Sequence, residues 1–374
     1  MKRIKQLLHL AASLVVFFLV LELCARLDDL ARYGAPIWSS YNSGCLFQWD
    51  QLGKRGKPGG RYKKWQQNSL GYRGPELRPG TVRIACLGAS ETFGLYEEEG
   101  QEYPRQLERD LGRWAGKGLF EIVNVAYPGQ TLGTAALRVP EMVESVKPRF
   151  ALIYPSPANY IGLPRTNFST QSEPEFDWRT TERVRAAAKS FPDFIQIGLR
   201  EVQTRFIEYS IKHRVAGLPR MDRVPEEDVR HFRSDLMFLV AVLRERGVEP
   251  VLVTHATVFG KELSLRDRQM LIVWRDSHPM LKESGFVDME QRMNDVVRTL
   301  AVEQHLNLID AAAEIPHSYR YFADYAHFTT AGAELMADKI AQALELVLSS
   351  KVSNSTAATA QQNHPKDTAK VETP

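Results

Sequence analysis

Short uninterrupted runs of apolar residues recur along the chain from about residue 80 onward. Five of these runs have the length of strands, at residues 82–87, 122–126, 150–154, 250–254 and 306–309. Because polar residues do not alternate within them, the runs are typical of strands buried on both faces of a parallel sheet. The pattern predicts five strands inside a covered sheet.

The stretches between these runs carry apolar residues at helical spacing. Three such stripes are Tyr103, Leu107, Leu111 and Trp114; Phe232, Leu236, Leu239 and Leu243; and Met336, Ile340, Leu344 and Val347. The alternation of strands and helices predicts an α/β fold, a three-layer α/β/α sandwich around a doubly wound, mainly parallel five-stranded sheet of the flavodoxin-like kind. Ligands bind such folds at the carboxyl ends of the strands.

The beginning of the chain has the pattern of a membrane element. Lys2, Arg3 and Lys5 precede a run, residues 7–21, that holds no formal charge when its histidine is neutral. This run is somewhat shorter than the ~20 residues that span a bilayer, but Lys5 and Arg26 can snorkel and extend its reach. The basic flank predicts an N-terminus in the cytoplasm and the main domain on the other side.

Two other interpretations of this element stay open. A cleaved signal peptide needs small residues at its cleavage site, and no good pattern of that kind precedes residue 40. A buried core helix would not ordinarily come first with this charge bias. We therefore expect an uncleaved anchor over residues 1–27.

The rest of the chain divides by composition. Residues 28–80 form an approach segment, rich in glycine and in basic residues that we interpret as a solvated or headgroup-facing surface, with polyanion binding as the alternative. Residues 81–350 form the domain. Its insertions, about 160–230 and 256–300, should emerge near the catalytic edge, where they either shape a substrate cleft or add packing. The tail, 351–374, lacks apolar periodicity and should be disordered.

Composition narrows the function further. The chain has 374 residues, 44% hydrophobic, with a net charge of only +3, so it can bury one large core and carries no basic stripe for nucleic acid. Its cysteines (Cys24, Cys45 and Cys86) have no zinc-binding spacing. We expect neither a metal nor another cofactor.

Two short motifs carry the candidate chemistry. Ser90 directly follows the first strand-like run, after a glycine and an alanine, so its hydroxyl would lie at the carboxyl edge of the sheet. His327 stands three residues after Asp324 and just before a helix-like segment. A serine, a histidine that accepts its proton and a carboxylate that orients the histidine form the constellation for acyl transfer.

Four blocks in this chain order resemble the SGNH hydrolase family, also called the GDSL esterases and lipases. The blocks are residues 87–94, 124–131, 152–160 and 324–332, and the resemblance covers roughly residues 80–348. Two positions depart from the family pattern, since Ala89 replaces the usual aspartate before the serine and Tyr160 replaces the aspartate after the asparagine. Residues 68–74 also look like a stretch found in membrane-anchored bacterial members.

The resemblance implies a role for each block. Ser90 would be the nucleophile, His327 the general base and Asp324 its orienting group. The oxyanion would be held by the backbone N–H groups of Ser90 and Gly129 and by the side-chain amide of Asn159, a neutral donor that adds no charge beside the base. Gly129 suits this role because a residue without Cβ permits close backbone approach.

Two further residues are candidate substrate contacts. His255 ends the fourth strand and should lie near the edge of the cleft, and Glu91 follows the nucleophile, where its charge would repel anionic substrates. Packing is the alternative role for His255, and a place at the start of the helix is the alternative for Glu91.

Together these features favour a membrane-anchored serine ester hydrolase. By resemblance, it would be a single-pass protein of the bacterial cytoplasmic membrane with a periplasmic or extracellular domain that removes O-acyl groups, acetyl above all, from glycans or small esters. Two alternatives remain: an O-acetyltransferase acting on a cell-surface or exopolysaccharide glycan, and a non-catalytic glycan-binding or assembly protein. Dinucleotide binding is disfavoured because the glycine spacing at residues 88–94 does not fit it. The sequence names no protein partner.

Overall fold

The computed structural model describes residues 2–33, 36–38, 45–161, 191–214, 217–260 and 262–362. Its centre is a sheet of five strands in the order β6-β5-β7-β8-β9, and every neighbouring pair is parallel. The strands are β5 (Val82–Gly88), β6 (Phe120–Asn124), β7 (Phe150–Tyr154), β8 (Glu249–Val253) and β9 (Asn307–Ile309). The predicted flavodoxin-like sheet is confirmed, with strand ends displaced by at most two residues.

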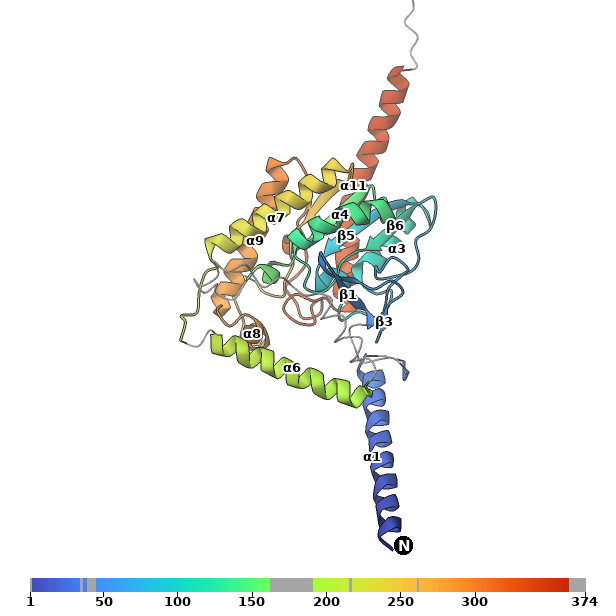
Figure 1. Ribbon diagram of the computed structural model, residues 1–374. Coiled ribbons are helices and arrows are strands. Elements are labelled where there is room, and N and C mark those ends of the chain that lie inside the picture. Colours follow the sequence, from blue (N-terminus) through green and yellow to red (C-terminus); the bar gives the residue numbers. More distant parts are fainter. Residues whose placement is uncertain are drawn as a thin grey trace, which may run out of the picture.

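Helices cover both faces of this sheet (Figure 1). Helix α3 (Tyr103–Ala115) packs against α11 (Thr330–Gln362). Helices α4 (Leu132–Val146) and α9 (Glu283–Glu303) each pack against α7 (Glu226–Glu245). The predicted stripes face the core: Leu107, Leu111, Phe232, Leu236, Leu239, Leu243, Met336, Ile340 and Leu344 are fully buried. Two residues at the ends of stripes are less buried. Val347 is half-buried, and Trp114 is 40% exposed and stacks on Phe120 at the margin of the domain.

Further helices lie between these elements. They are α2 (Ser90–Phe93), η2 (Pro157–Tyr160), α6 (Asp193–Arg214), α8 (Leu265–Ser277) and α10 (Ala311–Glu314). Helix α11 continues to Gln362, so the tail predicted to be disordered from residue 351 begins as helix. Addition of a residue to an existing helix needs no new nucleation, which explains the extension. Residues 363–374 lie outside the described part of the chain.

The N-terminal helix α1 (Lys2–Tyr33) projects away from the domain (Figure 1). Over Lys2–Ala31 it is long and apolar enough to cross a membrane, and none of its most apolar window is buried in the protein. Its 32 residues would span about 48 Å at ~1.5 Å per residue, more than the ~30 Å hydrocarbon core of a bilayer. A signal sequence has the same profile, so the helix fits either an anchor or a cleaved signal.

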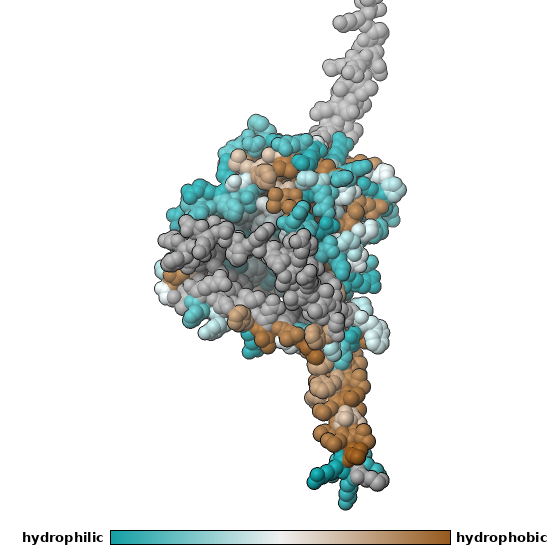
Figure 2. All heavy atoms as spheres, viewed as in Figure 1, coloured by the Kyte–Doolittle hydropathy of each residue, from teal (hydrophilic) through white to brown (hydrophobic). Residues whose placement is uncertain are grey.

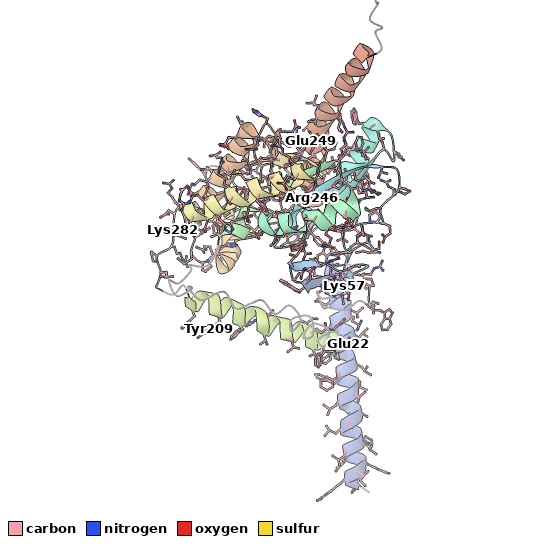
Figure 3. All side chains as sticks on the ribbon, turned by 45° about the horizontal axis from the view of Figure 1, so that its top comes forward. Glu22, Lys57, Tyr209, Arg246, Glu249 and Lys282 are labelled. Carbon is pink, nitrogen blue, oxygen red and sulfur yellow. The ribbon has the colours of Figure 1, made fainter. Side chains whose placement is uncertain are left out.

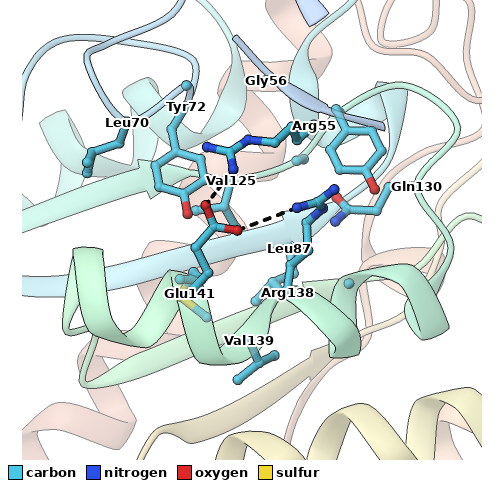
Figure 4. Close-up of a pocket in the computed structure, with 15 residues that line it drawn as sticks. Arg55, Gly56, Leu70, Tyr72, Leu87, Val125, Gln130, Arg138, Val139 and Glu141 are labelled. Atoms are coloured by element: carbon cyan, nitrogen blue, oxygen red, sulfur yellow. Dashed lines mark hydrogen bonds and ion pairs between the residues drawn. The ribbon is translucent and has the colours of Figure 1, made fainter. Parts of the chain in front are cut away.

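Much of the approach segment is folded onto the domain. It contains two short antiparallel hairpins, β1 (Phe47–Asp50) with β2 (Gly53–Gly56) and β3 (Arg61–Tyr62) with β4 (Trp65–Gln66). The first hairpin is pinned to α4, because Arg138 binds Asp50 at 2.8 Å and Glu141 binds Arg55 at 2.8 Å. Figure 4 shows the pocket that lies between this hairpin and α4.

The composition suggested that the basic residues of the approach segment lie on a solvated surface. In the structure, some of them are buried or paired instead. Lys63 is only 5% exposed, and its ammonium group lies 3.2 Å from the equally buried carboxylate of Asp29 near the end of α1. Arg55 is paired with Asp50 and Glu141. These cations serve to hold the approach segment between helix α1 and the domain, because a buried charge is stable only beside a partner.

Candidate active site

The carboxyl edge of the sheet collects the predicted residues from five parts of the chain. Ser90 directly follows β5, Gly129 follows β6, Asn159 lies in η2 after β7, and His255 follows β8. His327 stands between β9 and α11. Parallel strands end at one edge, so residues far apart in sequence meet there.

Ser90 sits on a tight strand-to-helix turn. It is the first residue of α2 and is half-buried. Gly88 makes this turn possible, because a Cβ there would come within 2.1 Å of the Thr92 hydroxyl and 2.8 Å of the Tyr154 carbonyl oxygen. The chain can therefore pack its first helix directly against the sheet and hold the serine at the edge.

The hydroxyl of Ser90 is hydrogen-bonded to a buried carboxylate. Its Oγ donates to Oε2 of Glu91 at 3.3 Å, and Glu91 is only 3% exposed. The other oxygen of Glu91 accepts a hydrogen bond from Ser156 at 2.8 Å and lies 3.4 Å from Nε2 of His255. Glu91 therefore connects the serine turn with the segments that follow β7 and β8.

His255 lies between two carboxylates. Its Nδ1 is 2.8 Å from Oε2 of Glu290 on α9, and the hydroxyl of Tyr325 donates to the other oxygen of Glu290 at 3.1 Å. Burial alone would lower the pKa of His255, but the charges and hydrogen bonds of Glu290 and Glu91 raise it well above its usual range. His255 is therefore a cation that balances the negative charge of Glu91.

Sequence reasoning had assigned Glu91 and His255 to substrate contact, and the structure places both in the interior. His255 is 1% exposed, and each side chain uses its polar atoms on protein partners. Although burial raises the pKa of Glu91, the hydrogen bond and charge of His255 lower it further, so the carboxylate stays ionised. The pair forms a charged support behind Ser90 rather than a wall of the cleft.

The carboxylate of Asp324 makes three hydrogen bonds that position His327, two to His327 itself and one to the backbone of Ala326. Its Oδ1 accepts the backbone N–H groups of Ala326 and His327 at 3.0 and 2.9 Å, and its Oδ2 lies 2.7 Å from Nδ1 of His327. An ionised carboxylate only accepts hydrogen bonds, so Nδ1 must carry the proton. Nε2 is then left as the basic nitrogen, and it is buried without a hydrogen-bond partner among the described residues.

Charges around His327 favour its protonated form. Burial alone would lower its pKa, but the hydrogen bond to Asp324 and the charges of Glu91, Asp324 and Glu97 raise it above the usual value. Two aromatic rings flank the imidazole: Tyr96 at 5.3 Å and Trp274 at 6.0 Å between centroids. The histidine is thus strengthened as a base and largely screened from water, with 6% of its surface exposed.

Glu97 lies in the same loop as Tyr96. Burial raises the pKa of its carboxyl to about 7, in spite of the backbone hydrogen bonds and the Arg73 charge that lower it. Glu97 can therefore exchange a proton near neutral pH within the electrostatic reach of His327.

The Gly129 and Asn159 blocks are in contact with each other. The side-chain amide of Asn159 donates to the carbonyl oxygen of Gln130 at 3.0 Å. Gly129 has a φ of +80° and open space where a Cβ would stand, and both Gly129 and Asn159 are exposed. Tyr160, which replaces the usual aspartate, donates its hydroxyl to Asp235 on α7 at 2.9 Å. The substitution thus ties η2 to α7 and leaves Asn159 at the surface.

Arg73 is an organising residue that the sequence analysis did not single out. Its buried guanidinium donates to the carbonyl oxygens of Phe93 and Gly94 and lies 3.5 Å from the carboxylate of Glu102. These contacts fix the loop that leaves α2 and carries Tyr96. The sequence pointed to this region only through residues 68–74, which look like a stretch found in membrane-anchored bacterial proteins. It gave no role to Arg73 itself.

The second insertion also reaches the site. Trp274 of α8 stacks beside His327 and meets the ring of Tyr325 at 4.4 Å. His278, directly after α8, lies 3.0 Å from the carbonyl oxygen of Ala158 in η2. Insertion 256–300 therefore borders the predicted base and the predicted oxyanion block. In sequence its aromatic residues were indistinguishable from helix packing.

The described part of the first insertion, by contrast, begins beside helix α1. Helix α6 is in contact with α1 and with α8. Residues 162–190 of this insertion, whose aromatic residues suggested a substrate cleft, fall outside the described residues.

Comparison with known proteins gives structural matches alone. No protein-family model and no curated protein matches the chain. It is similar to the acetyl xylan esterase AlAXEase, with 14% identity, a TM-score of 0.41 and coverage of 70% of this chain and 99% of that one. It is similar to the lipase/acylhydrolase from Enterococcus faecalis, with 17% identity, a TM-score of 0.41 and coverage of 70% and 94%.

A further match is a GDSL-like lipase from Bacteroides thetaiotaomicron VPI-5482, with 12% identity, a TM-score of 0.40 and coverage of 71% of this chain and 88% of that one. By their names, these three solved structures are an esterase, a lipase/acylhydrolase and a GDSL-like lipase.

Proposed function

We propose that the protein is a serine ester hydrolase. The observation that carries the proposal is the pairing of Asp324 with Nδ1 of His327 at 2.7 Å. It leaves a basic, buried and unpartnered Nε2 at the sheet edge that also holds Ser90. A histidine oriented in this way can take a proton from a neighbouring nucleophile and return it to a leaving group.

The proposed reaction begins when the hydroxyl of Ser90 turns from Glu91 to Nε2 of His327. Oγ forms a bond to the ester carbonyl carbon as its proton passes to Nε2. The tetrahedral intermediate collapses, the carbon–alkoxy bond breaks, and His327 gives its proton to the departing alcohol. Water then attacks the acyl-serine with His327 again as base, which releases the carboxylic acid and restores Ser90.

The oxyanion of both intermediates would be held by the N–H groups of Ser90 and Gly129 and by the amide of Asn159. Support comes from the hydrogen bond that joins the Gly129 and Asn159 segments and from the exposure of both residues at the edge. The Asn159 amide has two N–H bonds, so one can remain on Gln130 while the other turns to the oxyanion.

Glu91 would act on the same reaction through charge. The ionised carboxylate raises the pKa of His327, which stabilises the imidazolium formed in each tetrahedral intermediate. His255 prevents the buried carboxylate from taking up a proton of its own. Glu91 and His255 are thus positioning residues in this proposal: Glu91 accepts the hydrogen bond of the resting Ser90 hydroxyl, but neither side chain forms a bond to the substrate or takes up the transferred proton.

For the substrate, we propose O-acyl groups, acetyl above all, on glycans or small esters outside the cytoplasm. The basic residues at the start of α1, before its apolar run, support an orientation with the domain on the outer side of a bacterial cytoplasmic membrane. The exposure of Gly129 and Asn159 supports a site open to an ester on a bulky alcohol.

The test uses the full chain in lipid nanodiscs with a chromogenic acetyl ester and, separately, a fluorophosphonate that reacts with activated serines. We expect hydrolysis and a single covalent adduct on Ser90, and neither in the folded Ser90→Ala variant. Equal rates in both proteins together with no adduct on Ser90 would overturn the proposed nucleophile.

An acyltransferase is the second candidate, because the screening of His327 by Tyr96 and Trp274 limits water access. With an oligosaccharide acceptor added, a hydrolase would release acetate at an unchanged yield, whereas a transferase would move the acetyl group onto the acceptor. Mass spectrometry of the acceptor separates the two outcomes.

A further inference from the structure

Helix α6 is attached to the N-terminal helix at a defined level. The backbone N–H of Phe194 donates to the carboxylate of Glu22 at 3.2 Å, and Arg26 lies 3.5 Å from Asp193. Both residues of α1 stand just after its charge-free run. Figure 3 shows Glu22 where the two helices meet and Tyr209 near the opposite end of α6.

The first turn of α6 also reaches back beside the apolar run. The ring of Phe194 stacks on that of Phe18 at 5.8 Å and 20°. Since Phe18 belongs to the run that would lie in hydrocarbon, this contact sets the depth of α6 at the boundary where that run ends. In Figure 1 α6 extends crosswise from α1, between the domain and the free shaft of that helix.

One face of α6 is apolar and uncovered. Leu199, Val202, Phe206 and Tyr209 are 54%, 67%, 68% and 65% exposed. Their spacing of three, four and three residues places them on a single stripe of the helix. Figure 2 shows hydrophobic side chains along the lower edge of the body beside the apolar shaft of α1. Soluble surfaces rarely leave such rows of large apolar groups in water.

We propose that α6 is an interfacial helix that lies in the membrane surface and buries this stripe among the lipids beside α1. The inference rests on the proposed placement of α1 across a bilayer. A lipid surface fits better than a protein partner, because the same medium that covers α1 also covers the stripe continuous with it. Tyr209 at one end and the 88% exposed Trp38 beside Arg26 are the aromatic residues that such interfaces favour.

The test measures depth at single positions of the full chain in nanodiscs. Cys24 and Cys45 are replaced by serine, and a nitroxide is attached to Val202→Cys or Phe206→Cys. Collisions with lipid-soluble oxygen and with a water-soluble nickel chelate are then compared by electron paramagnetic resonance. We expect both positions to favour oxygen at least several-fold over the chelate, relative to a water-exposed control.

Two matched controls bracket the result. Glu201→Cys is adjacent in sequence but lies off the stripe, and Val302→Cys is an equally exposed apolar position, 75%, at the far end of α9. Both should prefer the chelate. A chelate preference at Val202 and Phe206 would overturn the inference, as would protection of both positions from oxygen and chelate alike, which indicates a second copy or another protein on the stripe.

This readout does not depend on catalysis. A chain that shows the expected depths but no esterase activity would overturn the proposed function and leave the interfacial helix standing. If the protein isolated from cells had lost residues 1–27 by cleavage, α1 would not be a membrane anchor, and the inference that rests on it would be overturned.

Discussion

The sheet edge that carries Ser90 and His327 and the pair of helices α1 and α6 depart from the usual distribution of residues in opposite ways. At the edge, charged groups such as Glu91, His255 and Glu290 are buried, and each is satisfied by a neighbour. On α6, large apolar groups such as Phe206 are exposed and have no protein cover among the described residues. The edge buries charged groups away from water, and the helix pair exposes apolar side chains on its surface. In the proposals made above, the first exception serves a charge that develops during the reaction and the second serves contact with lipid.

The largest expected effect separates the two regions completely. Substitution His327→Ala should lower kcat on an acetyl ester on the order of 10⁴-fold, because it removes the base that serves both steps. Membrane attachment and the oxygen preference at Phe206 should not change. Steady-state kinetics and sedimentation with vesicles measure the two effects, and a variant within tenfold of the parent rate would remove His327 from the mechanism.

The next effect concerns the outer part of the edge. Asn159→Ala removes one oxyanion donor, so kcat should fall about 10²- to 10³-fold with little change in KM. The melting temperature should stay close to that of the parent, because Asn159 is exposed and its side chain makes a single hydrogen bond among the described residues, to Gln130. A loss confined to KM would assign Asn159 to substrate binding instead.

Arg73 tests whether the loop after α2 depends on a buried ion pair. Arg73→Ala leaves Glu102 buried without its cation, and breaking a buried pair in this way costs about 3–5 kcal/mol. Denaturant unfolding should show this loss, and activity should fall because the loop that carries Tyr96 is released. Arg223→Ala, at a side chain 78% exposed, is the matched control and should change neither quantity.

The smallest effect is a displacement along the pH axis. The base acts when neutral, and its raised pKa places the acidic limb of kcat/KM above pH 6.5, with activity increasing as the proton leaves. Glu91→Gln removes a negative charge that favours the imidazolium, so this limb should move to lower pH. Glu98→Gln, at a side chain 64% exposed, should leave the limb in place, and an unmoved limb in both variants would show that Glu91 does not act on His327.

The fold was predictable because its signals are local. A strand buried on both faces is written as an uninterrupted apolar run, and β7 has the predicted bounds, Phe150–Tyr154. The Asp324–His327 contact was predictable for the same reason, since both residues belong to one turn. The roles of Glu91 and His255 were not, because these two residues are far apart in sequence and meet only in the folded chain. Glu290, the second partner of His255, lies on another helix, and nothing in its sequence neighbourhood marks it as that partner.

Long-range contacts also determine where the insertions lie in the fold. The sequence treated residues 160–230 as a candidate cleft wall on the strength of their aromatic residues. In the structure, Phe194 from this stretch stacks on Phe18 and binds Glu22. Such a contact depends on two segments that only the folded chain brings together, so no periodicity within either segment could reveal it.

The buried pair of Lys63 and Asp29 has a consequence for how such an enzyme would search for its substrate. A catalytic domain on a loose linker sweeps a hemisphere whose radius is set by the length of that linker. Here a clamp at the end of α1 removes that sweep. If α1 spans a bilayer as proposed, the site stays at one height, and encounters are set by lateral diffusion and by the number of substrate molecules per unit area of membrane. The rate of turnover would then depend on the surface density of substrate in the same membrane rather than on its concentration in the compartment outside.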